Sequence, residues 1–207
     1  MRRVAVLKDL LLAAALGAAL GAAPAALADD IHVAEVSLEQ TDDGILLAAD
    51  FDFELNPRLA EVVRNGVPLY FVVEFELTRA RWWWFDEKAA DKRLQVRLSY
   101  HALSRHYRLS TGVLQQNYAT LEDALNVLRR LRRWHVLDRG TLQADVDYQA
   151  AVRMRLDSTQ LPKPFQLSAL TSRELTLESS WKRFTFRPTP QPPAPVESRQ
   201  PREVEPK

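Results

Sequence analysis

Apolar and polar residues alternate one by one over long stretches of this chain. Four such stretches are found at 45–55, 69–77, 94–100 and 146–156. A period of two places one set of side chains in a core and the other in water, which is typical of antiparallel sheets. Shorter segments of the same kind are found at 31–40, 107–111 and 175–186. The pattern predicts about seven strands, with a β-bulge or an edge position where the alternation breaks after Val33.

Two segments follow a helical period instead. Asn56 is placed to cap the first helix, Pro57 suits its first position, and Gly66 ends it. Thr120 is placed to cap the second. Its apolar positions recur at helical spacing, at Leu121, Ala124, Leu125, Leu128 and Leu131. We expect the arginines between 129 and 133 in its last turns, where they suit the negative end of the helix dipole.

The balance of these elements predicts the fold class. Strands outnumber helices and do not alternate with them, which disfavours a parallel sheet flanked by helices. We therefore expect an antiparallel β-sandwich, immunoglobulin-like in outline, with two short helices inserted in the connections. The chain has no cysteine, so its stability must come from packing two apolar sheet faces against each other.

The first 28 residues have the parts of a secretory signal peptide. A positively charged start precedes an uncharged apolar run at 10–23, and Ala26 and Ala28 provide the small residues of a cleavage site before Asp29. The run is about 21 Å long as a helix, which is short for a hydrocarbon core of about 30 Å. We expect export by the general pathway and cleavage after Ala28. The mature protein is then periplasmic, without stable membrane insertion; an uncleaved anchor is the alternative.

The other end of the chain has a different composition. Residues 187–207 are rich in proline and polar side chains. Such a segment buries too little apolar surface to offset the entropy lost on ordering, which predicts a disordered, proline-rich tail. Between the leader and the tail, residues 29–186 contain no internal repeat and no linker, so we expect one β-sandwich domain there.

Composition excludes several classes of function. The 207 residues include 28 Lys and Arg against 27 Asp and Glu, a formal net charge of +1. This balance gives no field that would attract nucleic acid. The absence of cysteine removes thiolate metal sites, iron–sulfur clusters and cysteine nucleophiles. No glycine cluster, G-x-S-x-G elbow or HExxH motif is present, so we expect no cofactor, no metal and no catalytic residue.

Acidic residues alternate along two of the predicted strands. Asp50, Asp52 and Glu54 belong to one strand, and Glu74 and Glu76 to another. These carboxylates could form the acid pair of a hydrolase or a calcium site, but no loop or glycine follows Asp52, as a calcium loop requires. We favour solvent-facing side chains that pair across strands, at about 0.2–1 kcal/mol each. The outward-facing partners are Arg93, Arg97, Arg153 and Arg155.

The most unusual run is Arg79-Ala80-Arg81-Trp82-Trp83-Trp84-Phe85, which is followed by a polar turn at 86–92. Consecutive side chains of an extended strand point to opposite faces, so these tryptophans cannot all enter one core. They form either a cluster packed in the core and against a helix, or an exposed aromatic–arginine patch for a protein, glycan or lipid headgroup. The candidate partner-binding residues are Arg79, Arg81, Trp82, Trp83 and Trp84.

A short proline-containing segment follows the last long strand. Pro162 and Pro164 predict an extended, non-helical path. Leu161, Phe165 and Leu167 are placed to anchor this path on the sandwich. We favour a structural corner, and the alternative is an element that contacts a partner as a peptide would.

These features together resemble one protein family. The similarity is found in the Trp82–Phe85 hairpin, residues 98–101 leading into 107–109, a helix ending near Trp134, the segment 161–166, and Trp181. This set resembles the domain of unknown function 4390 family of proteobacterial envelope proteins over residues 29–186. The resemblance implies a place in the cell envelope and a membrane sensor protein as one candidate partner. It implies no activity and no catalytic residue.

The sequence therefore predicts a non-catalytic binding or accessory module of the periplasm. We expect it to act through protein–protein contacts with an envelope protein. An envelope hydrolase with a carboxylate-based site is the alternative. A deep pocket with convergent polar groups favours the hydrolase, whereas a flat, exposed tryptophan–arginine surface favours the module.

Overall fold

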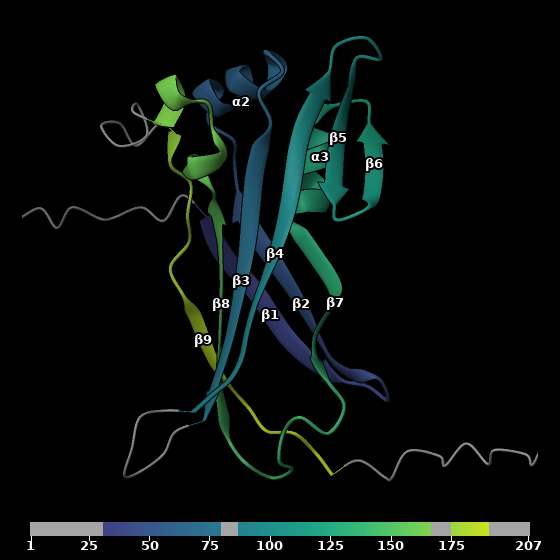
Figure 1. The fold of residues 1–207 in the computed structure, drawn as a ribbon, viewed down its shortest axis with the longest axis vertical. Coiled ribbons are helices and arrows are strands. Elements are labelled where there is room, and N and C mark those ends of the chain that lie inside the picture. Colours follow the sequence, from purple (N-terminus) through teal and green to yellow (C-terminus); the bar gives the residue numbers. More distant parts are fainter. Residues whose placement is uncertain (1–30, 80–86, 167–174, 191–207) are drawn as a thin grey trace, which may run out of the picture.

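A computed structural model describes residues 31–79, 87–166 and 175–190 of the chain. Within these residues the strands form two antiparallel sheets (Figure 1). The smaller sheet has the order β1 (Ile31–Gln40), β2 (Gly44–Phe53) and β7 (Arg130–Asp138). The larger sheet has the order β6 (Leu114–Tyr118), β5 (His106–Thr111), β4 (Glu87–His101), β3 (Leu69–Arg79), β8 (Tyr148–Leu156) and β9 (Lys182–Phe186).

Two short helices lie where the chain passes from one sheet to the other. Helix α2 (Pro57–Arg64) connects β2 to β3, and α3 (Leu121–Leu128) connects β6 to β7. Both predicted caps are confirmed. The side chain of Asn56 accepts a hydrogen bond from the Leu59 amide at 2.8 Å, and that of Thr120 accepts one from the Asp123 amide at 3.1 Å. A short 3₁₀ turn, Ser158–Gln160, follows β8. The predicted antiparallel β-sandwich with helices in its connections is thus confirmed.

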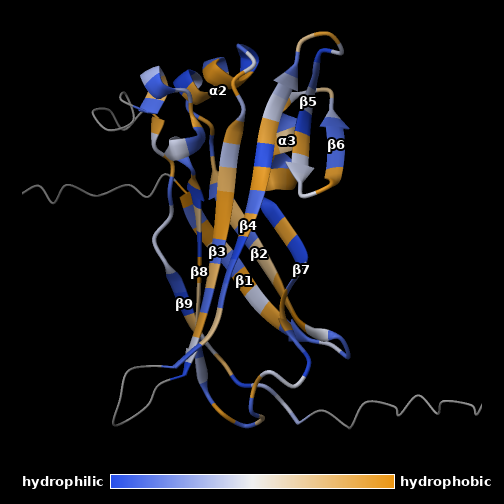
Figure 2. Ribbon diagram, in the orientation of Figure 1, coloured by the Kyte–Doolittle hydropathy of each residue, from blue (hydrophilic) through white to orange (hydrophobic). Residues whose placement is uncertain are grey.

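The core lies between the two sheets and is built by the alternation of their strands. Every second residue of β2 is buried, as predicted, at Ile45, Leu47, Ala49, Phe51 and Phe53. The larger sheet contributes Phe71, Phe75 and Met154, which have no exposed surface. The rings of Phe53 and Phe71 meet across the core at 5.7 Å between centroids. Figure 2 shows hydrophobic residues concentrated along β3 and alternating with hydrophilic ones along β7.

The predicted extension of the second helix through the arginines is wrong. Helix α3 ends at Leu128, and Arg130–Asp138 is strand β7. In this strand Leu131 and Trp134 lie opposite Ala49 and Leu47 of β2 and pack against the core. A helix at this position could not form the hydrogen bonds with β2 that make β7 the third strand of the smaller sheet. Arg133 has a φ of 52° at the register shift, which shows how a bulge interrupts the strand pattern.

Other predicted bounds change in the larger sheet. The expected turn at 86–92 is wrong, because β4 begins at Glu87 and pairs with β3 as far as Arg79. Strand β6 was not predicted. The expected strand at 175–186 is confirmed only for β9, with an isolated bridge between Arg155 and Glu178. The break after Val33 is confirmed as a bulge between Val33 and Glu35, and β1 is also an edge strand.

The proline-containing segment does not follow the predicted extended path. Residues 163–166 form a helical turn, in which the amides of Phe165 and Gln166 donate to the Pro162 carbonyl at 2.9 and 3.2 Å. Proline is compatible with the first turn of a helix because the amides there need no partner within the helix. Leu161 is buried and Phe165 packs against the core, as predicted. Leu167 lies outside the described residues.

Residues at the predicted start of the tail contact the body of the fold. Arg187 forms two hydrogen bonds with Asp147, at 2.7 and 2.8 Å, and Gln40 exchanges hydrogen bonds of 2.9 Å with the backbone of Thr189. The predicted leader at 1–28 and residues 191–207 lie outside the described residues. Among those described, no helix combines the length and the apolar character of a membrane span.

Candidate functional site

The outer side of the six-stranded sheet carries a group of arginines. In β4 and β8 they alternate with residues that point into the core, such as Leu98 and Met154. Arg183 of β9 lies opposite Ala151 of β8 and therefore points to the same outer side. We call this surface the arginine face and define it by Arg93, Arg97, Arg153, Arg155 and Arg183.

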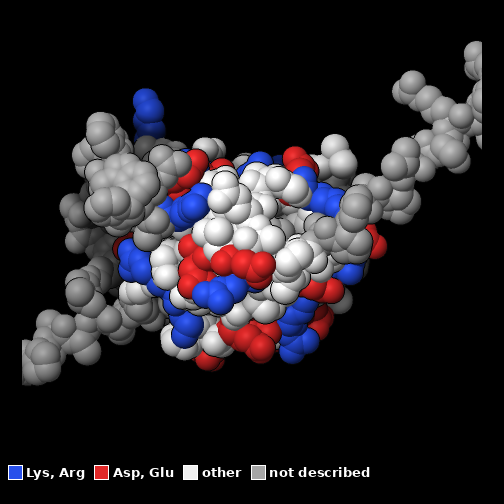
Figure 3. Space-filling view, turned by 90° about the horizontal axis from the view of Figure 1, so that it is seen from below, with Lys and Arg blue, Asp and Glu red and all other residues white. Residues whose placement is uncertain are grey.

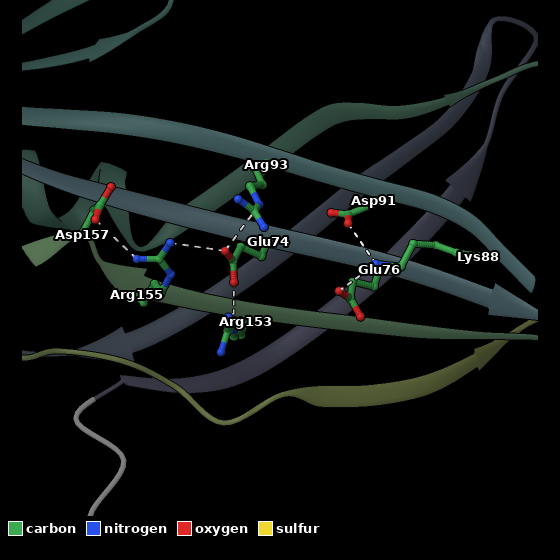
Figure 4. Close-up of polar contacts among 8 residues, drawn as sticks. All are labelled: Glu74, Glu76, Lys88, Asp91, Arg93, Arg153, Arg155 and Asp157. Atoms are coloured by element: carbon green, nitrogen blue, oxygen red, sulfur yellow. Dashed lines mark hydrogen bonds and ion pairs between the residues drawn. The ribbon is translucent and has the colours of Figure 1, made fainter. Parts of the chain in front are cut away.

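Glu74 lies at the centre of the arginine face. It occupies β3, directly opposite Arg93 on β4 and Arg153 on β8. Its Oε2 accepts a hydrogen bond of 2.5 Å from Arg153 Nε, and its Oε1 lies 3.4 Å from Nη2 of Arg155 and 3.6 Å from Nε of Arg93 (Figure 4). The predicted pairing of Glu74 with arginines across strands is confirmed.

The predicted solvent exposure of Glu74 is wrong. Only 6% of its side chain is exposed. It lies on the outer side of the sheet, but arginine side chains from both neighbouring strands contact its carboxylate and cover it. One buried carboxylate therefore holds guanidinium groups from two different strands. Glu74 faces arginine on both sides only because β3 lies between β4 and β8, and the sequence contains no local signal for this strand order.

Aromatic rings and a second carboxylate fix the same arginines further. The guanidinium carbon of Arg153 lies 4.5 Å from the ring centre of Trp181, and that of Arg97 lies 5.9 Å from the ring centre of Tyr70. Arg155 also approaches Oδ1 of Asp157, at 3.6 Å. Such contacts restrict the guanidinium groups before any partner binds. The arginines of the face outnumber Glu74 and Asp157, so positive charge and donor groups remain for a ligand.

A second cluster further along β3 has one cation and two carboxylates and therefore a net negative charge. Lys88 Nζ donates to Asp91 at 2.9 Å and to Glu76 at 3.3 Å. The hydrogen bond to Asp91, followed by the one to Glu76, raises the pKa of Lys88, and the hydrogen bond from Lys88 lowers the pKa of Asp91. The positive excess therefore lies on the arginine face and not beside Glu76. Figure 3 shows basic and acidic side chains interspersed over one end of the molecule.

The acidic residues of β2 lie on the other sheet and do not join Glu74. Asp50 accepts a hydrogen bond of 2.6 Å from Nη2 of Arg132 in β7, a partner that the sequence did not suggest because β7 was read as helix. Asp52 and Glu54 are exposed, as predicted. The carboxylates singled out in the sequence thus belong to two separate surfaces.

The described surface includes a hollow beside Arg132 and another beside Trp181, both shallow. One of about 240 Å³ is lined by residues of β1 and β2 with Arg132, and Glu35 and Asp50 are cross-strand neighbours in it. Another of about 130 Å³ lies between the start of β1 and residues 179–182. Both are smaller than the roughly 300–1,000 Å³ of typical ligand pockets. The described residues include no group of three or more His, Asp or Glu that could hold a metal ion.

The predicted tryptophan–arginine patch is described only at its first residue. Arg79 is partly buried at the end of β3, and its Nη1 donates to Oε1 of Gln143 at 2.9 Å. Arg81, Trp82, Trp83 and Trp84 lie outside the described residues, so their part in binding stays a prediction. Trp181, beside Arg153, belongs to the residues that carry the family resemblance, but its sequence position did not indicate a site.

Comparisons with known proteins agree with the resemblance noted in the sequence. Neither the comparison with curated proteins nor the comparison with solved structures gives a match. A family model described as a domain of unknown function matches residues 28–185. This range includes every strand of both sheets except the last residue of β9. The chain therefore belongs to the family described as Domain of unknown function (DUF4390).

Proposed function

We propose that this chain is a non-catalytic binding module of the periplasm that contacts an envelope protein through the arginine face. The leader at 1–28 directs the export in this proposal. The observation that carries the proposal is that the buried carboxylate of Glu74 contacts the guanidinium groups of three arginines, Arg93, Arg153 and Arg155. The partner segment is acidic, since carboxylates accept paired hydrogen bonds from arginine in a fixed planar geometry.

The residue types on this surface support a protein contact. Arginine, tryptophan and tyrosine are the types enriched at energetically important positions of protein interfaces. Here Trp181 and Tyr70 lie beside Arg153 and Arg97. Binding also costs less side-chain entropy when the guanidinium groups already have fixed positions.

The charge pattern favours a protein partner over an anionic lipid surface. Lys88, Glu76 and Asp91 form a cluster of net negative charge beside the arginine face. A membrane presents negative charge over its whole area, so it would repel these carboxylates wherever it attracted the arginines. A protein segment can place its own charges to match both clusters, and such complementarity selects a partner.

The proposal is tested by site-specific photo-crosslinking in intact cells. Gln95 is exposed, lies between Arg93 and Arg97 in β4, and is therefore a suitable position for a photoreactive residue. We expect a crosslinked envelope protein from this position, and its loss when Arg93→Gln and Arg97→Gln are added. The matched control pair, Arg58→Gln with Arg64→Gln, removes the same charge from α2 and should leave the crosslink unchanged.

Two results contradict this proposal. One is a crosslink that survives removal of Arg93 and Arg97, which would place the contact elsewhere. The other is binding of the purified mature chain to vesicles with anionic lipid, lost in the same variant, with no crosslinked protein in cells. In that case the arginine face contacts lipid.

A further inference from the structure

The open sheets of the described fold end in four edge strands, of which three are protected against pairing with another chain. Strand β1 has the bulge after Val33 and the exposed glutamates Glu35 and Glu39. Strand β7 has arginines and an irregular register, and β9 begins with Lys182 and Arg183. Charges and bulges of this kind are how natural sheets prevent edge-to-edge association.

The edge strand β6 has none of these protections. Its sequence, Leu-Gln-Gln-Asn-Tyr, contains no charge, proline or glycine, and it pairs with β5 without a register shift. Among the described residues no strand pairs with its other side. At its start, Val113 is 96% and Leu114 is 71% exposed. An uncharged, regular edge next to exposed apolar side chains is a site for strand addition.

The hairpin geometry identifies the backbone groups that are open for pairing. Thr111 and Leu114 close a two-residue turn in which Gly112 has a φ of 57°. The closing pair of such a hairpin is hydrogen-bonded, and hydrogen-bonded pairs alternate with non-bonded ones along the strands. Leu114, Gln116 and Tyr118 therefore turn their backbone groups to β5. The backbone groups of Gln115 and Asn117 face outward.

We propose that β6 pairs with β6 of a second copy of this chain, antiparallel and with Gln116 on the twofold axis. This register places Leu114 opposite Tyr118 of the second copy, which is an apolar–aromatic pair. It places Gln115 opposite Asn117, so that the outward backbone groups of the two copies meet. A contact through a twofold axis must be self-complementary, and this strand is self-complementary without any like charges opposite each other.

The residues of β6 indicate that its partner is a second copy of this chain. A partner chosen by charge would need a charged residue on β6, and the strand has none. The exposed Leu114 finds its apolar cover in Tyr118 of the second copy, which already lies partly against the core of its own chain. The two larger sheets then join into one continuous sheet. This dimer does not use the arginine face and stands independently of the proposed function.

Sedimentation velocity of the mature chain over rising protein concentration tests the dimer. We expect a concentration-dependent dimer, and a dissociation constant at least about tenfold higher for Gln116→Lys, because like charges then face each other on the axis. Gln160→Lys, at an exposed position of the 3₁₀ turn, is the matched control and should dimerise as the unchanged chain does. Circular dichroism confirms that each variant is folded.

Mixing two variants tests the register. Gln116→Lys and Gln116→Glu should each be mainly monomeric alone, whereas their equimolar mixture should form a heterodimer with opposite charges across the axis. A chain that stays monomeric at every concentration overturns the proposal. A dimer that Gln116→Lys and Gln160→Lys leave equally strong also overturns it, because the interface then lies elsewhere. Binding of an extended partner peptide to β6 by a monomeric chain would assign the edge to that peptide instead.

Discussion

Glu74 determines how the side chains around it are arranged on the outer side of the larger sheet. It has oxygen atoms near the guanidinium groups of Arg93, Arg153 and Arg155 and is itself buried. A buried charge is tolerated only when it is paired, and removing it leaves its partners facing one another. The residue is therefore important to both stability and surface charge.

We predict that Glu74→Gln lowers the free energy of unfolding by about 1.5–3 kcal/mol, the value of hydrogen bonds to charged groups. Urea unfolding of the mature chain measures the loss. Glu76→Gln is the control. The Glu76 side chain is 37% exposed, and Lys88 keeps Asp91 as a partner when it is removed. Glu76→Gln should lower the free energy of unfolding by less than about 1 kcal/mol, as for other exposed ion pairs. Equal losses would show that burial of Glu74 does not matter.

Phe53 and Asp52 are neighbours in β2 with opposite environments. Phe53 is buried against Phe71, and Arg129 lies over its ring at 5.6 Å, whereas Asp52 is exposed. We predict that Phe53→Ala costs about 3–5 kcal/mol of stability, as buried phenylalanine truncations do. Asp52→Ala should cost less than about 1 kcal/mol. Chemical denaturation of both variants checks the assignment of inside and outside along β2, and similar losses would contradict it.

At the scale of elements, an ion pair joins two segments that flank the larger sheet. Arg187, just after β9, binds Asp147, just before β8, through both carboxylate oxygens. The hydrogen bond from Arg187 holds the pKa of Asp147 below its ordinary value. A carboxyl whose pKa is lowered on folding stabilises the folded state above its unfolded pKa, and this contribution is lost as the pH falls through the folded pKa.

Aspartate ordinarily has a pKa of about 4. We therefore predict that the pKa of Asp147 lies below this ordinary value. NMR titration of its carboxyl carbon measures this pKa. In the variant Arg187→Gln the pKa of Asp147 should return towards the ordinary value. An unchanged pKa of Asp147 in this variant would show that the two segments are not joined by this pair.

The elements themselves could be predicted where one period dominates. The strands around Phe51, Phe71, Leu98 and Met154 keep strict alternation and were found in the sequence. Strand β7 was not, because Leu125, Leu128 and Leu131 continue a helical spacing across the real helix end. Its own alternation is then broken at Arg133. Strand β6 has no β-branched residue and only Tyr118 as an aromatic one, so it lacks the composition that marks a strand, and its place depends on pairing with β5.

The site could be predicted only in part, because it depends on the order of strands in the sheet. The sequence indicated that Glu74 pairs with outward-facing arginines. It could not indicate that β3 lies between β4 and β8, which surrounds Glu74 with arginines and buries it. Nor could it place Trp181 beside Arg153, since 27 residues of chain lie between them. Non-local pairing of this kind is not encoded in any local period.

At the scale of the whole molecule, the predicted signal peptide at residues 1–28 can be tested directly by locating the N-terminus of the native protein. Ala26 and Ala28 follow the short apolar run and precede the first described strand, β1. We predict that the native protein begins at Asp29 and is recovered with the periplasmic fraction. Mass spectrometry of the N-terminal peptide from cells checks this. An intact Met1 in the membrane fraction would instead support the uncleaved anchor.

The order of the strands along the chain also has a consequence for synthesis. The hairpin of β1 and β2 is complete at Phe53, but β7 begins only at Arg130 and β8 only at Tyr148. A ribosome releases the N-terminal part of a chain first, and apolar surface that waits for its partners invites aggregation. Phe71 of β3 can cover Phe53 early, but the edge of β2 that pairs with β7 has no strand partner while most of the chain is made. We expect a chaperone that protects the chain before it folds to bind residues 44–53, whose outer edge has no partner until β7 is present.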